Sequence, residues 1–176
     1  MDVQIRVAQP ADLGPLGALA RQTYTDAYAH EMPAQALSEH LELHLSPDRL
    51  AGMLCRDVVL LAEVAGCLVG FVQFGATRPE YRSDDGTVYA TGDDLELRRL
   101  YVLAGFQNQG LGGVLMRAAF EHFWLTGRRV FLTVWHTNVA AQRFYARHHF
   151  RQIGIVPLRG GETGFDLLLL RDIRQS

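Results

Sequence analysis

The sequence has few cysteines, no long apolar run and no excess of charge of one sign. It contains two cysteines among 176 residues, which is too few for a disulfide-stabilised scaffold. No run approaches the roughly 18 apolar residues of a transmembrane helix, and the N-terminus lacks the apolar core of a signal peptide. With 17 basic and 19 acidic side chains, the net charge of −2 argues against nucleic-acid binding through bulk charge. We therefore expect a cytoplasmic protein with reduced thiols and no membrane or nucleic-acid partner.

What the sequence does have is the composition of a globular protein. Apolar residues make up 48% of the chain, which excludes a disordered protein. The length fits one domain with a sizeable core, and we expect a single domain over residues 1–176. The stretch 77–94 is rich in turn-forming and acidic residues; it is long for an idle loop, so we expect it to have a function.

The periodicity of apolar residues predicts a mixed α/β fold. The expected strands are 3–8, 57–64, 67–74, 95–102, 130–135, 151–156 and 165–170, and the expected helices are 10–29, 32–45, 47–54, 110–126 and 138–148. Ala65-Gly66 separates two β-rich runs and predicts a hairpin there. Strand–helix–strand units in the second half predict parallel pairing. We expect a mixed sheet with helices on both faces.

The segment Gln107-Asn108-Gln109-Gly110-Leu111-Gly112-Gly113 lies between an expected strand and a long amphipathic helix. Such a turn directs backbone N–H groups and the positive end of the helix dipole into one small space. Glycine lacks a Cβ, so an anion can approach the backbone closely. The segment predicts a phosphate or pyrophosphate site, although it matches neither a P-loop nor a Rossmann fingerprint. The alternative is that the glycines only shape the turn.

Two motifs together resemble the GCN5-related N-acetyltransferase (GNAT) superfamily. Q-x-x-G-x-G, starting at Gln107, resembles its phosphate-binding signature, and Asn138, Ala141 and Tyr145 resemble its N-x-x-A-x-x-x-Y segment. The resemblance covers about 57–170. It implies a mostly antiparallel central sheet with a splayed parallel strand pair and helices on both faces. His149 stands where the family often has glycine; if that position needs a left-handed backbone, histidine is among the residues that tolerate it better than most.

The resemblance implies acetyl-CoA as co-substrate and assigns residues to it. The pantetheine arm would pair with the strand segment Leu100, Tyr101 and Val102. The pyrophosphate would meet backbone N–H groups of Gln107, Asn108, Gln109, Gly110, Leu111, Gly112 and Gly113. Asn138 would bond the pantetheine side, cap a helix, or do both.

Two residues are candidates for the chemistry of amine acetylation. Tyr145 would protonate the departing thiolate; the alternative is a core tyrosine packed on Phe144. An alkylamine has a pKa near 10.4 and is mostly protonated at neutral pH, so a base must take its proton. Glu96 is the candidate base, and the alternative is a surface-facing strand residue.

The acceptor is predicted less firmly than the cofactor. Asp84, Asp85, Asp93, Asp94 and Glu96 form an acidic cluster that would attract a cationic amine, the alternative being a solvated loop. The segments YTDAYAH and LELRRLYV loosely resemble PaiA-like spermidine/spermine acetyltransferases. We therefore expect a small-molecule amine substrate such as a polyamine. The rival functions are protein N-terminal or lysine acetylation, a non-catalytic acyl-CoA sensor, and a mononucleotide binder.

Two features receive plainer interpretations. His40 and His44 lie four residues apart, but no third ligand is marked, so we expect a solvated helix face and no metal. The apolar strand FDLLLL, 165–170, serves either as the interface of a homodimer or as core.

Overall fold

The computed structural model describes residues 2–77, 94–123, 129–157 and 164–173. The chain forms two compact units, 1–74 with 99–121 and 75–98 with 122–176, and each is described by itself. The prediction of one domain over residues 1–176 stays a prediction.

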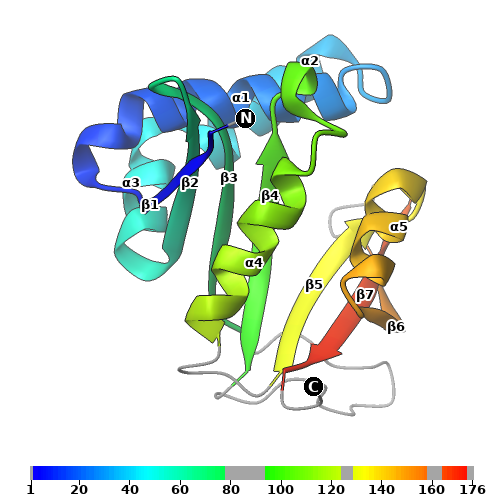
Figure 1. The fold of residues 1–176 in the computed structure, drawn as a ribbon. Coiled ribbons are helices and arrows are strands. Elements are labelled where there is room, and N and C mark those ends of the chain that lie inside the picture. Colours follow the sequence, from blue (N-terminus) through cyan, green and yellow to red (C-terminus); the bar gives the residue numbers. More distant parts are fainter. Residues whose placement is uncertain (1, 78–93, 124–128, 158–163, 174–176) are drawn as a thin grey trace. The chain divides into compact units, whose positions relative to one another are not determined.

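The described residues form seven strands and five helices, in the predicted order (Figure 1). The strands are β1 Gln4–Val7, β2 Val58–Val64, β3 Cys67–Ala76, β4 Leu95–Val102, β5 Arg129–Trp135, β6 Arg151–Pro157 and β7 Phe165–Asp172. The helices are α1 Leu13–Tyr28, α2 Ala34–Leu45, α3 Pro47–Arg56, α4 Leu111–Phe123 and α5 Val139–Arg147, with 3-10 turns at Pro10–Asp12 and Ala104–Phe106. None of the helices in the described ranges is long and apolar enough to cross a membrane.

The strands form one mixed sheet in the order β1-β2-β3-β4-β5-β7-β6. β4 and β5 are parallel and pair at Leu95↔Val130 and Glu96↔Phe131, whereas β1–β2, β2–β3, β5–β7 and β6–β7 are antiparallel. The expected mixed, mostly antiparallel sheet is thereby confirmed. The expected splay of β4 and β5 beyond this pairing stays a prediction.

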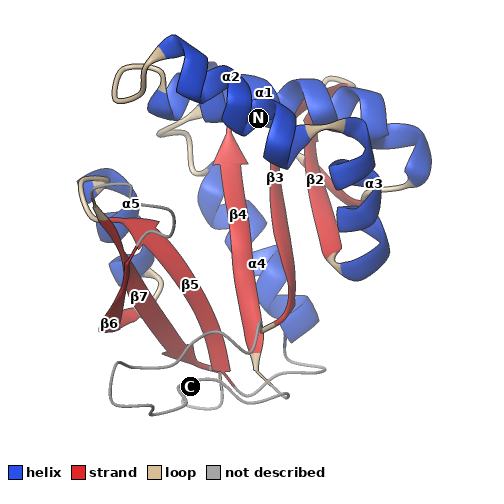
Figure 2. Ribbon diagram, turned by 180° about the vertical axis from the view of Figure 1, so that it is seen from behind, coloured by secondary structure: helices blue, strands red, loops and turns tan. Residues whose placement is uncertain are grey.

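The position of β7 corrects one expectation about the second half of the sheet. β5 and β6 flank a helix but do not pair in parallel, because β7 lies between them and is antiparallel to both (Figure 2). Leu168, Leu169 and Leu170 of β7 are at most 5% exposed. A strand that is apolar on both faces is most stable in the middle of a sheet, so these three leucines of the FDLLLL run are core.

In the first unit, helices cover both faces of the sheet. Phe71 of β3 clusters with Leu16 of α1 and Leu50 of α3. The neighbouring Gly70 faces the other way, toward Leu115 of α4. Figures 1 and 2 show α1 and α3 on one side of β2 and β3 and α4 on the other. The expected helices on both faces are confirmed for this unit.

Local turn geometry follows the residues that the sequence supplies. Ala65 and Gly66 have φ values of 50° and 78°, and two successive positive φ angles are the signature of a tight hairpin turn. Arg6 of β1 links this strand to the start of α1 and to β2. Its guanidinium lies 2.7 Å from Asp12 Oδ2 and 2.6 Å from Glu63 Oε1. The hydrogen bond from Arg6, with a further one from a backbone N–H, lowers the pKa of Asp12 to about 2.

Candidate active site

The predicted phosphate turn has the backbone of an anion site. Asn108 and Gly110 have positive φ angles of 59° and 85°, and α4 begins directly after them at Leu111. Asparagine is among the residues that adopt this conformation more readily than most. A Cβ at Gly110 or Gly113 would meet no heavy atom within 4 Å, so the space beside these glycines is open. The turn therefore offers open backbone at a helix N-terminus, which is the arrangement that binds anions.

Two glutamine side chains hold this turn against the end of β4. Gln107 Nε2 donates to Val102 O over 2.9 Å, and Gln109 Nε2 donates to Gly105 O over 2.9 Å. The backbone N–H of Gln107 donates to Ala104 O. In this structure Gln107 shapes the turn through both its amide groups. The assignment of residues 107–113 to the pyrophosphate stays a prediction.

The segment Leu100, Tyr101 and Val102 is half-buried at the end of β4. The ring of Tyr101 packs on Phe71 with centroids 5.8 Å apart. An ideal Cβ on Gly70 would lie 2.9 Å from Tyr101 O, so β3 and β4 approach closely here. Pairing of this segment with the pantetheine arm stays a prediction.

In the second unit, Asn138 caps α5 as expected. Its Oδ1 accepts a hydrogen bond of 3.0 Å from the N–H of Ala141. Gln142 Nε2 donates to His136 O over 2.9 Å, which fixes the loop before the helix. The cap is confirmed, and contact between Asn138 and the cofactor stays a prediction.

Tyr145 lies on the same helix with its side chain turned inward. It is 8% exposed, and its ring packs edge-on against Phe144 and Phe150 at 5.4 and 5.7 Å. His149 has a φ of 62°, a left-handed backbone, and Phe150 N donates to Tyr145 O over 3.1 Å. The packing on Phe144 is the one that the core interpretation predicted, and the proton-donor role is untested.

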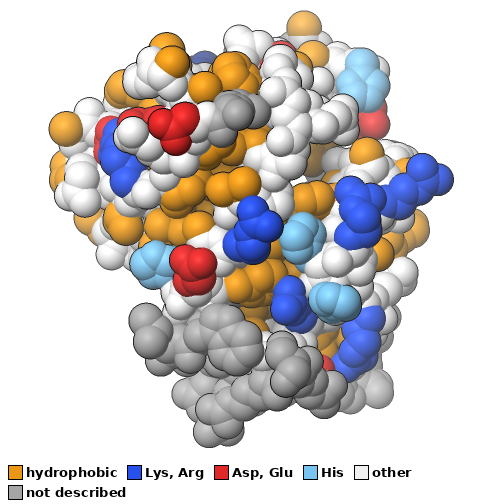
Figure 3. All heavy atoms as spheres, in the orientation of Figure 1, with side chains coloured by type: hydrophobic (Ala, Val, Ile, Leu, Met, Phe, Trp, Pro, Cys, Tyr) orange, Lys and Arg blue, Asp and Glu red, His pale blue; other side chains and the backbone are white. Residues whose placement is uncertain are grey.

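Basic side chains gather on the outer side of α5. Arg143 and Arg147 of α5 are exposed, as is His149 just after it. Figure 3 shows blue and pale blue side chains gathered on the side of the molecule where Figure 1 draws α5. The short helix α5 thus buries Tyr145 on its inner side and exposes arginines on its outer side.

Glu96 and Asp94 are buried, which corrects two expectations. Glu96 is 2% exposed and Asp94 is 1% exposed, so neither is a surface residue or part of a solvated acidic rim. Glu96 Oε2 lies 3.4 Å from Arg98 Nη2. Arg129 binds Asp94 with two hydrogen bonds, of 2.6 and 3.0 Å, which raise the pKa of Arg129. Burial without such partners would be costly for either carboxylate.

The basic partner in each of these pairs is an arginine, and the sequence contains no lysine. Asp84, Asp85 and Asp93, the other members of the expected acidic cluster, lie outside the described residues.

His40 and His44 belong to a stack of rings between α1 and α2. The Tyr24 ring lies parallel to His40 at 4.3 Å, and His44 lies 4.3 Å beyond. Burial, helped by the charges of His44 and Arg99, lowers the pKa of His40 to about 4. Within the described ranges, no three His, Cys, Asp or Glu side chains are grouped to hold a metal ion.

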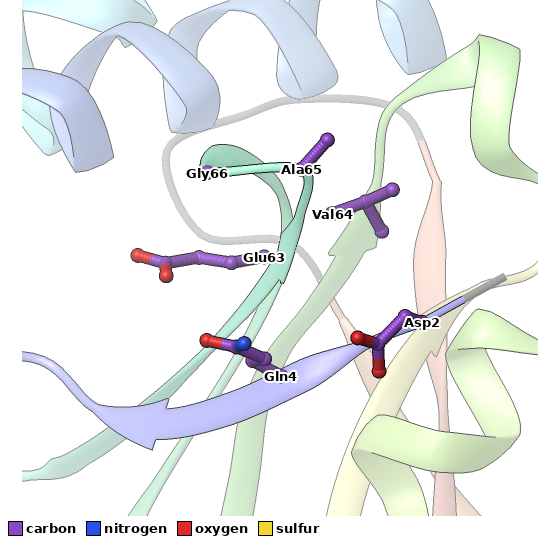
Figure 4. Close-up of a pocket in the computed structure, with 6 residues that line it drawn as sticks. All are labelled: Asp2, Gln4, Glu63, Val64, Ala65 and Gly66. Atoms are coloured by element: carbon purple, nitrogen blue, oxygen red, sulfur yellow. The ribbon is translucent and has the colours of Figure 1, made fainter.

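A pocket of about 280 Å³ lies elsewhere in the first unit, beside β1 and the β2–β3 turn (Figure 4). Its lining includes Asp2, Gln4 and Glu63, and it shares no residue with the predicted sites.

The sequence interpretation did not identify Asp166, Trp135 or His136 as candidate site residues. Asp166 faces Trp135 across the β5–β7 pair. The available signal was a single acidic residue inside the apolar run FDLLLL.

Known proteins share both the sequence pattern and the fold. The model of a family described as acetyltransferase (GNAT) family matches residues 19–150. An uncharacterized N-acetyltransferase of Mycobacterium tuberculosis is 29% identical over 166 residues, covering 92% of this chain and 98% of the relative. The spermine/spermidine N(1)-acetyltransferase of Bacillus subtilis is 30% identical over 99 residues, covering 54% and 60%. A PaiA N-acetyltransferase from Thermoplasma acidophilum, crystallised with coenzyme A, has a similar fold, with a TM-score of 0.79 at 18% identity over 98% of this chain and 99% of that chain.

Proposed function

Because the chain belongs to the acetyltransferase (GNAT) family and is an N-acetyltransferase, we propose that it transfers acetyl from acetyl-CoA to a small cationic amine. A polyamine is the first candidate. The observation that carries the use of acetyl-CoA is the turn after β4, with positive φ at Asn108 and Gly110, open space beside the glycines, and α4 starting at Leu111. This geometry suits a pyrophosphate.

In the proposed reaction the amine nitrogen attacks the carbonyl carbon of the thioester. A C–N bond forms, the C–S bond breaks, and coenzyme A leaves as a thiolate. The acceptor must first lose a proton, and Glu96, whose Oε2 lies 3.4 Å from Arg98 Nη2, takes it. Tyr145 gives its phenolic proton to the thiolate, and the second proton lost by the acetylated nitrogen restores the Tyr145 hydroxyl. Both residues belong to the second unit.

The support for a polyamine comes from relatives. The Bacillus subtilis relative is named as a spermine/spermidine N(1)-acetyltransferase. The acidic cluster gives less support than expected, because arginines neutralise Asp94 and Glu96.

The first experiment is thermal unfolding with acetyl-CoA, using ATP as the control. A ligand at 100 times its Kd adds about 2.7 kcal/mol of stability. This corresponds to a Tm increase of roughly 5 to 10 °C for a chain of this size. A shift with acetyl-CoA alone supports the proposal, and no shift at millimolar ligand contradicts it.

The acceptor is then screened by thiol release with spermidine, spermine and a lysine-containing peptide. Release with the peptide alone would favour protein acetylation. Acetyl-CoA binding without release for any amine would favour a sensor.

A further inference from the structure

A carboxylate and three rings gather where β5 ends and β7 begins, outside the residues assigned above. Trp135 and Asp166 are directly paired on these strands. The His136 ring stacks on Phe165, with centroids 4.4 Å apart and planes 18° apart, and lies 4.6 Å from the Trp135 ring. All four side chains are half-buried, so each remains partly accessible.

Asp166 differs from the other half-buried and buried carboxylates of this unit. Asp94 and Glu96 each have an arginine beside them. The interactions of Asp166 are a hydrogen bond with Thr133 and the charge of His136, and no arginine of the described ranges pairs with it. Burial raises the pKa of the Asp166 carboxyl, and Thr133 and His136 oppose that effect. A partly desolvated carboxylate without a cation is a position at which a cationic ligand is stabilised.

Gly164 determines where the Trp135 ring of this cluster lies. Gly164 has a φ of 137°, and a Cβ at this position would overlap the indole ring of Trp135. The absence of a side chain at Gly164 therefore lets the indole lie directly on the chain just before β7. This contact fixes the ring next to Asp166.

The strand registers place Asp166 and Trp135 on the same face of the sheet as Glu96. Glu96 pairs with Phe131, and Asp166 pairs with Trp135. Since paired residues share a face and faces alternate along a strand, both carboxylates lie on the face of Phe131 and Trp135. The β5 residues that pair with the two carboxylates, Phe131 and Trp135, are four residues apart, which corresponds to about 13 Å along the strand at about 3.3 Å per residue.

α5 lies on the opposite face of these strands (Figures 1 and 2). Arg171, which pairs with Val130 on that face, donates to His148 O over 3.0 Å. The face that carries Glu96 and Asp166 is therefore not the one that α5 covers.

We propose that Asp166, with the indole ring of Trp135, binds the second ammonium group of the acceptor, the one that does not react. This inference rests on the proposed function, in which the reacting amine lies near Glu96. The carboxylate accepts a charge-assisted hydrogen bond, and the indole face attracts a cation. The separation along β5 suits an extended polyamine rather than a short diamine.

The test compares spermidine with butylamine, which has one nitrogen, in wild type and Asp166→Asn. Asparagine keeps the size of the side chain and can still hydrogen-bond with Thr133. We expect the KM for spermidine to rise about tenfold or more, the size of one lost hydrogen bond to a charged group. The kcat, the KM for acetyl-CoA and turnover of butylamine should stay near wild type.

Asp172→Asn is the matched control. Asp172 lies on the same strand and the same face, near Arg151 at 3.8 Å, and the change removes the same charge. It should leave the preference for spermidine over butylamine unchanged. Equal losses for both amines in Asp166→Asn would overturn the proposal, since they would indicate a structural role. A wild type that acetylates other acceptors but shows no preference for spermidine would overturn it as well.

Calorimetric titration with spermidine separates this inference from the proposed function. If acetyl-CoA gives no thermal shift, the proposed function fails, and the titration still decides the inference. Spermidine binding that weakens about tenfold in Asp166→Asn supports the site. Absent binding, or equal binding by both proteins, refutes it.

Discussion

Gly70 of β3 is a position where one added methyl group tests the packing of the first unit. An ideal Cβ there would lie 2.9 Å from Tyr101 O, 3.2 Å from Leu115 Cδ1 and 3.3 Å from Val102 Cγ2. The nearest atom belongs to the backbone of β4, so it cannot move aside as the end of a side chain can. Gly70→Ala must therefore shift β4, or α4, or both.

The expected cost follows from overpacking. Inserting a methyl group into a packed core costs typically about 1–3 kcal/mol, so we expect a loss of about 2 kcal/mol. For a chain of this size the Tm should fall by roughly 4 to 8 °C. Because the displaced carbonyl belongs to the segment proposed to pair with the pantetheine arm, acetyl-CoA should also bind more weakly.

Urea unfolding gives the stability change, and calorimetric titration gives the Kd for acetyl-CoA. Gly52→Ala is the control: the same methyl group in α3 meets first the guanidinium of Arg56, which can swing away, and alanine favours a helix. It should be neutral or stabilising. A Gly70→Ala protein as stable as wild type, with an unchanged Kd, would refute the close approach of β3 and β4.

Four other predictions concern the turn, the chemistry and pH. Gly110→Ala places a side chain at a φ of 85°, which costs about 1–2 kcal/mol, and calorimetry should show weaker acetyl-CoA binding; unchanged binding would count against the pyrophosphate assignment. Tyr145→Phe should lower kcat in a thiol-release assay by about a hundredfold with little change in the KM for acetyl-CoA, and a wild-type kcat would exclude Tyr145 as the acid. Glu96→Gln should flatten the acid limb of the pH–rate profile, whereas an unchanged limb means that another group takes the proton. The pKa of His40, lowered from 6.5 to about 4, means that protonation opposes folding, so stability should fall as the pH drops from 6.5 toward 4. In urea unfolding, His40→Phe should lose less stability than wild type across that window, by up to about 2 kcal/mol.

The sequence predicted features that depend on local chemistry. The hairpin at Ala65-Gly66 and the cap at Asn138 each depend on a residue and its immediate neighbours. The order and type of the helices and strands depend on periodicity over one element, and they were predicted correctly for the same reason.

Features that depend on distant partners were not predicted. Glu96 alternates with leucines and could face either way by sequence, and Arg129, which neutralises Asp94, comes 35 residues later in the chain. The place of β7 between β5 and β6 is set by competition among strands for the buried centre of the sheet. Asp166 was missed because its neighbours, Trp135 and Thr133, belong to another strand.

The absence of lysine from the ion pairs has a consequence for an enzyme that acetylates amines. A lysine in the place of Arg6, Arg98 or Arg129 would be a nucleophile that acetyl-CoA can modify, and acetylation would remove its charge. The guanidinium stays protonated and presents no free amine. Since the sequence has no lysine at all, no side chain of this protein is an amine acceptor for its own reaction. Its buried carboxylates therefore keep their cationic partners however long the protein is exposed to the acetyl donor.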